Sequence, residues 1–392
     1  AKQLEVRDEV HKTLKPKLVD GKLVTPYRKK EGELSKRGLT DDEYNRCITT
    51  NNTDPFMRQS LQEFNLGSRK QIGEYLIDFG WKPERFTPTG QPIVDEKTLS
   101  AITHIHEANL IAQFLLLQKR IAQIDSWIDA TEDDGRVHGF VIPNGAITGR
   151  MTHRNPNMAQ VPSSHNPYGK ECRACWTVEE GNVLLGVDAS GLEIRMLAHY
   201  MNDEEYTNEI INGDIHTSNQ ELAKLESRDK AKTFIYALMY GAGDEKLGNV
   251  VGGTTADGKR ARQYFFDNKP TFKSLRDRVQ RASAKGYLKG LDGRKLYVRN
   301  QHSALNTLLQ GAGAIIMKQA LVILSERLAL GTVPHKFVAN IHDEWQIEVP
   351  KCRAMRVGSL AVTSIIEAGE HFNLRCPLDG EYKIGDNWSE TH

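Results

Sequence analysis

The sequence contains few cysteines and no long apolar run. Its five cysteines are odd in number and scattered over 392 residues, so a disulfide framework is not expected and a reducing compartment fits. Cys172 and Cys175 form a Cys-x-x-Cys pair, but no second pair stands nearby at zinc spacing, which favours a structural or incidental role. No run approaches the roughly 20 apolar residues of a membrane span, and no signal peptide opens the chain. We therefore expect a protein without membrane contact.

Charge of one sign is not in excess either. The net charge of +1 does not by itself suggest a nucleic-acid partner. Between residues 251 and 300, however, 13 Lys or Arg stand against four Asp, a local excess of +9. A phosphate backbone attracts such a segment, but a solvated helix face explains the composition equally well. The length predicts roughly two or three domain-sized units.

The apolar pattern predicts a mixed chain of helices and short strands. In the stretch 95–128, apolar residues recur at steps of three and four, which is typical of one face of a helix. Helices are predicted over 68–79, 95–128, 191–201, most of 206–289 and 303–328, and strands over 183–187 and within 337–349. The chain begins with Ala1 in a charge-rich, helix-like stretch, so we expect it to be the tail of something longer or a processed product.

Two aspartates stand where a rigid scaffold can point a side chain into a cleft. Asp188 ends an apolar strand, and Asp343 lies at the tight turn of a predicted hairpin. Two such carboxylates brought together suit two divalent ions about 4 Å apart, as used for phosphoryl or nucleotidyl transfer, and oxygen ligands favour Mg²⁺. Either aspartate alone is better explained as the cap of a strand or turn.

A periodic stripe of cations and aromatic residues changes that balance. Arg228, Lys232, Tyr236 and Tyr240 recur every four residues, which places them along one slowly drifting face of a helix. Two cations there can hold a polyphosphate, and two rings farther along can stack on a sugar and a base. An amphipathic helix with solvated cations is the simpler alternative, but the mixture of charge with aromatics and the following Gly-Ala-Gly argue against it.

This helix resembles the dNTP-binding helix of family A DNA polymerases, the DNA polymerase I family. Residues Asp188 to Arg195 (Asp-Ala-Ser-Gly-Leu-Glu-Ile-Arg) resemble the first aspartate motif of that family, and Ile341 to Glu344 (Ile-His-Asp-Glu) resemble the second. Thr148-Gly149-Arg150 and Asn306 to Gln310 also resemble family motifs, in the family order. Two further segments are Gly213-Asp-Ile-His216-Thr and Lys232-Thr-Phe-Ile-Tyr236. The last two are most similar to the replicative polymerases of short-tailed phages. The resemblance covers residues from about 65 to the end, the polymerase portion only.

The resemblance implies a metal and phosphate machinery. Asp188 and Asp343 would ligate two Mg²⁺ ions, with the carbonyl of Ala189 as an extra ligand. The residues that would contact the triphosphate are Arg228, Lys232 and His216, with Lys232 also a catalytic residue. An accessory or structural role for Glu344 is at least as expected as ligation.

The resemblance also implies a nucleotide pocket and a set of DNA contacts. Tyr236 would line the sugar pocket and Tyr240 the base pocket, while Glu193 would be the steric gate in the space that a 2′-OH needs. The residues expected to read the minor groove and primer terminus are Arg150, Gln310, His342 and Asn306. Such contacts test the shape of a base pair without reading its sequence.

The implied fold is α+β, a right hand with an antiparallel palm sheet and mostly helical fingers and thumb. The expected domains are a partial thumb at 1–128 with a short insertion at about 18–63, a palm at 129–205 and 290–392, and fingers at 206–289. The basic segment 251–300 then lies where a template would pass. The expected partners are primer–template DNA and dNTPs, and the expected location is the cytoplasm, which is the host cytoplasm if the chain is phage-encoded.

Two departures from the family pattern stand out. Ala237 occupies a position that is usually Gly, and its methyl group could narrow the pocket. Nothing here resembles the proofreading exonuclease of the phage relatives, and the insertion is shorter than the one that clamps a host thioredoxin in them. A processivity factor or a separate exonuclease chain therefore stays open as a partner.

Three other classes compete with a DNA polymerase. A magnesium nuclease also needs paired aspartates but has no use for the cationic and aromatic stripe. A single-subunit RNA polymerase shares the palm and the stripe, yet should not carry the bulky Glu193 where the 2′-OH belongs. A non-catalytic DNA-binding remnant is expected to have lost an aspartate, and both Asp188 and Asp343 are present.

Overall fold

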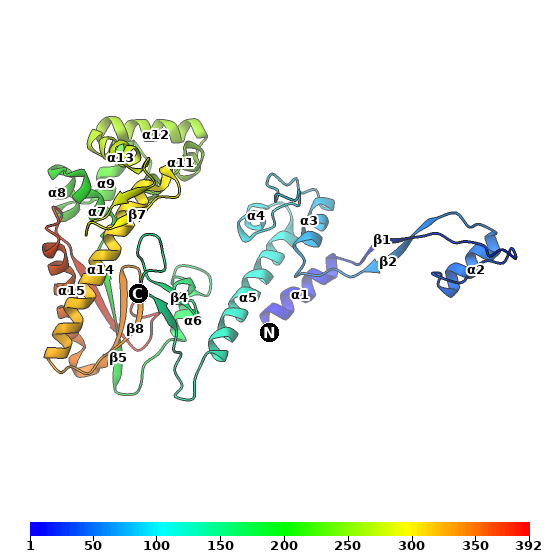
Figure 1. Ribbon diagram of the computed structural model, residues 1–392, viewed down its shortest axis with the longest axis horizontal. Helices are drawn as coiled ribbons and strands as arrows, with labels where there is room; N and C mark the ends of the chain where they lie inside the picture. The colour runs from blue at the N-terminus through cyan, green and yellow to red at the C-terminus, as the bar shows by residue number, and fades with distance from the viewer. The chain divides into compact units, whose positions relative to one another are not determined.

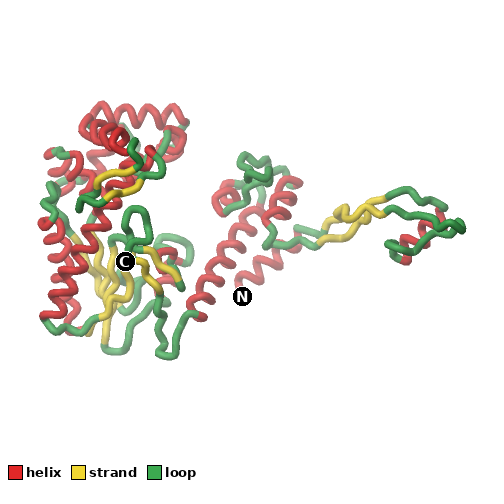
Figure 2. The backbone as a smooth tube through the Cα atoms, in the orientation of Figure 1, coloured by secondary structure: helices red, strands yellow, loops and turns green.

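The computed structural model describes residues 1–392 and divides into two compact units. The N-terminal unit is Ala1–Asp125 and the C-terminal unit is Ser126–His392. The helix α5 (His106–Asp129) crosses the boundary between them. Figures 1 and 2 show a mainly helical N-terminal unit with one ribbon of strands, and a C-terminal unit that combines a sheet with many helices.

The N-terminal unit is a small helical cluster from which a two-stranded ribbon extends (Figure 1). Its elements before α5 are α1 (Lys2–Thr13), β1 (Lys17–Val24), α2 (Asp41–Thr50), β2 (Phe56–Gln62), α3 (Arg69–Asp78) and α4 (Glu96–Ala101). The predicted helix over 68–79 is confirmed as α3, whose N-cap Ser68 accepts a hydrogen bond from the backbone of Gln71. The core of this unit consists of buried aliphatic side chains, among them Val10, Leu14, Ile72, Leu76, Leu99 and Ile111.

The single helix predicted over 95–128 is wrong at its start. The structure has two helices there, α4 and α5, separated by residues 102–105. Ile102 and Ile105 are both 4% exposed, and leaving helical geometry between them lets the chain bury both side chains. Periodicity alone could not detect this break, because the stripe of apolar residues continues on the far side of it.

The insertion predicted at about 18–63 folds as an antiparallel ribbon with a helix at its far end. Strands β1 and β2 pair with Leu18 opposite Leu61 and Leu23 opposite Met57. Helix α2 begins at a capping box in which the hydroxyl of Thr40 and the carboxylate of Glu43 bond each other's backbone N–H groups.

A four-stranded antiparallel sheet lies at the base of the C-terminal unit, in the order β10-β5-β9-β8. Its strands are β5 (Asn182–Ala189), β8 (Lys336–Ile341), β9 (Glu344–Pro350) and β10 (Gly380–Gly385). The predicted strand over 183–187 and the predicted hairpin within 337–349 are confirmed as β5 and as the pair β8–β9. The helices α7 (Leu192–Met201), α14 (Ala304–Leu330) and α15 (Ala354–His371) pack with this sheet or on one another.

Helices α8 to α13 form a second layer of the C-terminal unit, beyond α7 and the upper part of α14 (Figure 1). They are α8 (Glu204–Asn212), α9 (Ile215–Ala223), α10 (Arg228–Met239), α11 (Asp244–Val251), α12 (Thr255–Asn268) and α13 (Pro270–Ser283). The remaining elements are β3 (Phe140–Ile142), β4 (Thr152–Arg154), α6 (Gly169–Ala174), β6 (Tyr287–Lys289), β7 (Lys295–Tyr297) and three single turns of 3₁₀ helix at Met158–Gln160, Gln301–Ser303 and Lys351–Arg353.

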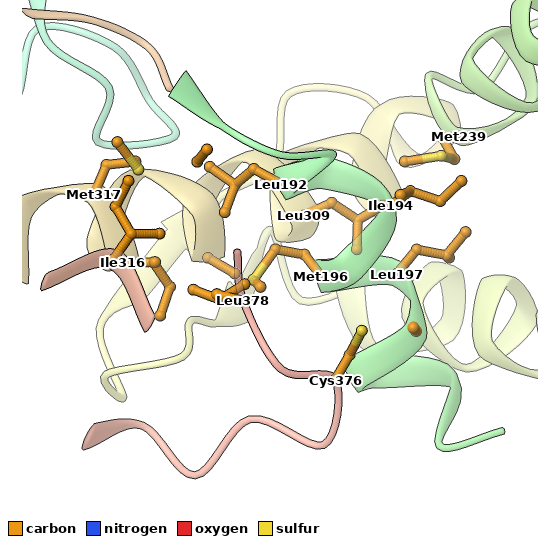
Figure 3. Close-up of a cluster of buried hydrophobic side chains, with 14 of the residues drawn as sticks. Leu192, Ile194, Met196, Leu197, Met239, Leu309, Ile316, Met317, Cys376 and Leu378 are labelled. Carbon is orange, nitrogen blue, oxygen red and sulfur yellow. The ribbon is translucent and has the colours of Figure 1, made fainter. Parts of the chain in front are cut away.

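One continuous hydrophobic core joins the sheet to the helical layer. Figure 3 shows the part of it around α7, where side chains of α7 meet those of α10 and α14. The labelled residues are Leu192, Ile194, Met196, Leu197, Met239, Leu309, Ile316, Met317, Cys376 and Leu378. Because α7 begins just after Asp188, this packing holds the end of β5 in place.

Contrary to the sequence expectation, one segment is long and apolar enough to cross a membrane. It is Gln301–Leu330, which contains α14, and 67% of its most apolar window is buried inside the C-terminal unit. Figure 1 shows α14 running past the sheet and alongside α15. Its apolar composition is accounted for by packing on all sides, as in the core helix of a large domain.

Candidate active site

The two predicted aspartates lie on neighbouring strands. Asp188 is near the end of β5, where it pairs in register with Glu344 at the start of β9. Asp343 occupies the turn between β8 and β9, and its carbonyl oxygen accepts a hydrogen bond of 3.1 Å from the backbone N–H of Ala189. His342 adopts a left-handed conformation with φ of 61°, which lets the two-residue turn close. The sheet therefore brings both carboxylates and the backbone of Ala189 to one edge.

The electrostatics of this edge suit a cation. Burial, followed by the nearby charge of Asp343, raises the pKa of Asp188 to about 7. Burial also raises the pKa of Asp343. Neither carboxylate forms an ion pair with a lysine or arginine, so a divalent ion would relieve both the repulsion and the burial of charge. This donor set of hard oxygen atoms fits Mg²⁺.

The aspartates are not accompanied by a third acidic, histidine or cysteine side chain in a metal-binding cluster. Further ligands would have to come from the backbone, from water or from a substrate. Mg²⁺ sites of polymerases and kinases have this composition, with one or two carboxylates and the oxygens of substrate phosphates. The same finding leaves Cys172 and Cys175 without a third or fourth ligand for zinc.

Glu344 is held by the protein itself. Its side chain is 5% exposed overall and accepts hydrogen bonds of 2.6 Å from Trp388 Nε1 and from Gln346 Nε2. His392 Nδ1 lies 2.9 Å from its other oxygen. Although burial acts in the opposite direction, the hydrogen bond from His392 lowers the pKa of Glu344. Both oxygens of Glu344 are thus engaged by side chains of the protein.

The stripe of cations and aromatics lies on α10, as the spacing predicts. Ser227 caps the helix at its start through a hydrogen bond from the backbone of Lys230. The opposite face is buried in the core through Ala231, Phe234, Ile235 and Leu238. Tyr240 is the exception to the prediction, because it lies at the C-cap just beyond the last helical residue. Gly241 follows with φ of 78°, and a Cβ there would overlap the carbonyl oxygen of His302.

Tyr236 is the residue of α10 that the charges of the two aspartates affect. The end of the sheet that carries Asp188 and Asp343 is called the acidic edge below. The ring centroid of Tyr236 lies 6.4 Å from that of His216 and 6.3 Å from that of Tyr240. Burial raises the pKa of Tyr236, and the charges of Glu193, Asp343 and Asp188 add to the effect. The phenol therefore lies within electrostatic reach of both aspartates. Ala237, the departure from the family pattern, is 7% exposed and belongs to the core side of the helix.

Glu193, Tyr240 and Arg150 form one hydrogen-bonded group. Glu193 is 9% exposed. One of its oxygens accepts a hydrogen bond of 2.5 Å from the Tyr240 hydroxyl, and the other accepts one of 2.8 Å from Arg150 Nη2. Burial, together with this bond to Glu193, raises the pKa of Tyr240. The predicted gate residue is therefore fixed from both sides, and Arg150 is partly engaged by the protein.

The predicted phosphate contacts differ in how they are held. Arg228 forms an ion pair with Asp214, with 2.6 Å between Nε and Oδ2. His216 is half-buried, and its Nδ1 is buried without a hydrogen-bond partner. Burial, followed by the charges of Arg228 and Lys232, lowers the pKa of His216. Lys232 is exposed.

A narrow hollow lies between α14 and the turn that carries His342 and Asp343. It is lined by Arg150, Met151, Ala314, Met317, Lys318, Asn340 and His342, so two of the predicted DNA-reading residues meet there. Asn306 and Gln310, one to two turns earlier on α14, are half-buried. The amide oxygen of Asn306 is buried and has no hydrogen-bond partner, as expected of a group that awaits a ligand.

Two residues of this region were missed by sequence reasoning. Asp214 stands beside His216 in a motif that resembles the family, but only its contact with Arg228 gives it a place in the site. Lys318 lines the hollow, and its Nζ donates a hydrogen bond of 2.6 Å to Asn144 Oδ1. Its position eight residues after Gln310 on a predicted helix was the available signal.

The basic segment 251–300 is only partly available to a ligand. Lys269 is 6% exposed and lies 3.0 Å from Glu205 and 3.4 Å from Asp203. Arg262 pairs with Asp244. The local excess of +9 therefore includes cations that stabilise the packing of α8 to α13.

Comparison with known proteins agrees with the fold and with the family resemblance. DNA polymerase family A matches residues 41–390. The chain is 41% identical over 374 residues to the DNA-directed DNA polymerase of Enterobacteria phage T3 and 40% identical to that of Escherichia phage T7, in each case covering 84% of this chain and 53% of the relative. It thus spans about half the length of these relatives.

Among solved structures, the fold is similar to the POL domain of Pol1 from M. smegmatis, in complex with a DNA primer-template and dNTP. The TM-score is 0.76 at 23% identity, over 84% of this chain and 62% of that one. The fold class expected from the sequence, α+β with an antiparallel sheet, is confirmed. The chain belongs to DNA polymerase family A.

Proposed function

We propose that this chain carries out template-directed DNA synthesis, adding dNTPs to the 3′-OH of a primer. The observation that carries the proposal is the hydrogen bond from Tyr240, at the end of the α10 stripe, to Glu193, which follows Asp188 by five residues. A triphosphate held along α10 would then present its α-phosphate near the two half-buried carboxylates, whose charges also act on Tyr236. The activities named for the phage relatives support the same reaction.

Two Mg²⁺ ions would be held by Asp188, Asp343 and the carbonyl oxygen of Ala189. When bound, such ions lower the pKa of the primer 3′-OH and neutralise charge on the leaving pyrophosphate. The protein's own contribution is rigidity. The register of β5 with β9 and the packing of α7 fix both aspartates, and Glu344 keeps the neighbouring strand ends together through Trp388.

Arg228, Lys232 and His216 would bind the phosphates of the incoming nucleotide. Lys232 is exposed, and we expect it to offset the charge that develops during transfer. Tyr236 would line the sugar pocket and Tyr240 the base pocket. Glu193, held by Tyr240 and Arg150, would occupy the volume that a 2′-OH requires.

The hollow beside α14 would receive the primer terminus. Arg150 and His342 line it, and Gln310 and Asn306 precede it on α14. Donors at these places would test the acceptors that every correct pair shows in the minor groove. Lys318 would add a positive charge at the end of this track.

In this proposal the segment 1–128 is the thumb, 129–205 and 290–392 the palm, and 206–289 the fingers. The exposed cations of 251–300 would follow the template. The ribbon of β1 and β2 with α2 would be the place for a processivity factor, and a separate exonuclease chain would supply proofreading, for which we assign no site in this chain. Synthesis would take place in the cytoplasm.

One assay tests the proposal. The chain is incubated with a labelled primer–template and Mg²⁺, first with dNTPs and then with rNTPs. We expect extension with dNTPs that stops at the template end, and little with rNTPs. Extension with rNTPs at a similar rate would favour an RNA polymerase, and shortening of the DNA in the absence of nucleotides would favour a nuclease. If the chain binds DNA but catalyses no reaction, the result would favour a non-catalytic DNA-binding remnant.

A further inference from the structure

We infer that Asp214 is a positioning residue for the incoming nucleotide: it presents Arg228 and His216 together to the triphosphate. The inference rests on the proposed function and deepens it. Asp214 would touch neither the nucleotide nor the metals. Its effect would pass through the Arg228 guanidinium and through the backbone turn that carries His216.

The ion pair between Asp214 and Arg228 uses one edge of the guanidinium. Arg228 Nε donates to Asp214 Oδ2 at 2.6 Å, and Nη2 donates to Oδ1 at 3.2 Å. A guanidinium is planar and cannot turn its edges independently. The hydrogens of Nη1 and the outer hydrogen of Nη2 therefore remain on the edge away from Asp214, in the fork geometry that suits a phosphate. The ion pair therefore orients Arg228 and leaves these hydrogens available to a phosphate.

The same carboxylate fixes the start of α9, which carries His216. Asp214 is the N-cap of this helix. It accepts a hydrogen bond of 3.1 Å from the backbone N–H of His216 and one of 2.9 Å from Thr217 Oγ1. One side chain thus links the first turns of α9 and α10, the two places where phosphate-binding groups are expected.

His216 gives an independent sign that a ligand is expected there. Its ring approaches that of Tyr236, and its Nδ1 is buried without a hydrogen-bond partner. A buried polar atom of this kind is rare in a folded protein without a function to explain it. The charges of Arg228, Lys232 and Asp214 all act on this ring, so the four side chains share one electrostatic neighbourhood.

Two other readings of the contact make different predictions. If Asp214 were a competitor that Arg228 must leave before nucleotide binds, its removal would tighten nucleotide binding. If it were only a helix cap, its removal would lower stability and leave nucleotide binding unchanged. Positioning predicts weaker nucleotide binding at nearly unchanged stability when the cap is preserved.

The chain offers a variant that separates the cap from the ion pair. Serine is as good an N-cap as aspartate, but it carries no charge for Arg228. In single-nucleotide incorporation with the full chain and a primer–template, we expect Asp214→Ser to raise the apparent Kd for dNTP about three- to tenfold. The maximal rate should stay within about threefold. Asp214→Asn, which also caps, should lie between Asp214→Ser and the parent protein, and it replaces Asp214→Ser if that variant is unstable.

A matched control and a double mutant complete the test. Asp229→Asn removes a negative charge that also acts on Arg228 but makes no hydrogen bond to it, so it should change the Kd for dNTP by less than about twofold. Arg228→Ala should weaken dNTP binding by at least about thirtyfold. In the Arg228→Ala background, Asp214→Ser should add less than about twofold, because its partner is gone.

The outcomes are distinguishable. If Arg228→Ala leaves dNTP binding unchanged, the proposed phosphate site is wrong. If Arg228→Ala weakens binding but Asp214→Ser does not, only the positioning role is wrong and Asp214 is a cap. Tighter binding by Asp214→Ser, or equal effects of Asp214→Ser with and without Arg228, would also overturn the inference.

Discussion

The acidic edge of the sheet and the stripe on α10 differ in how their functional groups are held before any substrate arrives. At the edge, Asp188 and Asp343 are half-buried on neighbouring parts of the sheet and form no ion pair with a lysine or arginine, and burial raises the pKa of Asp188 to about 7. On and around α10 the groups already have partners: Arg228 has Asp214, and Tyr240 has Glu193. Lys232, which is exposed, and His216, whose Nδ1 has no hydrogen-bond partner, are the exceptions.

In the proposed function, the difference follows from what each region would bind. A divalent ion needs bare carboxylates, and their mutual repulsion is the driving force for taking it up. A nucleotide changes at every cycle, so its pocket works best when the side chains are oriented in advance and lose little entropy on binding. Repulsion between carboxylates therefore destabilises the acidic edge, although the sheet holds it rigid. The α10 region is stabilised by hydrogen bonds and ion pairs among its own side chains.

Removal of one charge at the acidic edge should have the largest effect. Asp188→Asn or Asp343→Asn should reduce primer extension by about 10³-fold or more, about 4 kcal/mol of barrier, while primer–template binding stays largely intact. Because the change also relieves repulsion, the Tm measured in EDTA should not fall below that of the parent protein. Extension above a tenth of the parent turnover would contradict the metal assignment.

Loss of a single hydroxyl on α10 should come second. A dideoxynucleotide lacks the 3′-OH that can bond its own phosphates, and a Tyr236 hydroxyl can supply the missing bond. We expect the parent protein to use ddNTPs within about tenfold of dNTPs. Tyr236→Phe should restore discrimination by roughly 10²- to 10³-fold, about 3–4 kcal/mol.

Competition between each ddNTP and its dNTP in single-turnover extension measures this effect. Equal discrimination by both proteins would show that the hydroxyl lies outside the sugar pocket. The methyl group of Ala237 is buried on the core side of α10, so Ala237→Gly serves as a control for ring placement. We expect it to leave ddNTP use within about threefold.

Removal of the gate side chain should have a smaller effect on sugar choice. Glu193→Ala removes the volume expected to exclude a 2′-OH, so rNTP use relative to dNTP use should rise by at least about tenfold. Use of dNTPs should stay within about tenfold. Unchanged sugar selectivity in the ratio of kcat/KM for dNTP and rNTP would move the gate to another residue, with Tyr236 the next candidate.

The smallest effect is expected from loosening the gate without removing it. Tyr240→Phe deletes the hydroxyl that donates to Glu193, but Arg150 Nη2 still holds the other oxygen at 2.8 Å. The rise in relative rNTP use should therefore be below about fivefold. The same ratio of kcat/KM measures it. An effect as large as that of Glu193→Ala would show that Tyr240, and not Arg150, fixes the gate.

Local sequence pattern and motif order were sufficient to predict many of the helices and strands, the family and the fold class. The spacing of Arg228, Lys232 and Tyr236 requires one face of a helix, and the apolar run before Asp188 requires a buried strand, since both follow from backbone periodicity alone. The five ordered motifs were sufficient for the family and the fold class. Long-range facts were beyond such reasoning, because sequence spacing carries no information on contacts between elements.

The tertiary structure alone decided which groups are paired and which are left bare. Only the register of β5 against β9 places Asp188 beside Asp343, and only the packing of α9 on α10 gives Arg228 its partner Asp214. The break between α4 and α5 and the burial of Lys269 are of the same kind. In each case the free energy of a side chain depends on neighbours far away in the sequence, and folding determines those neighbours.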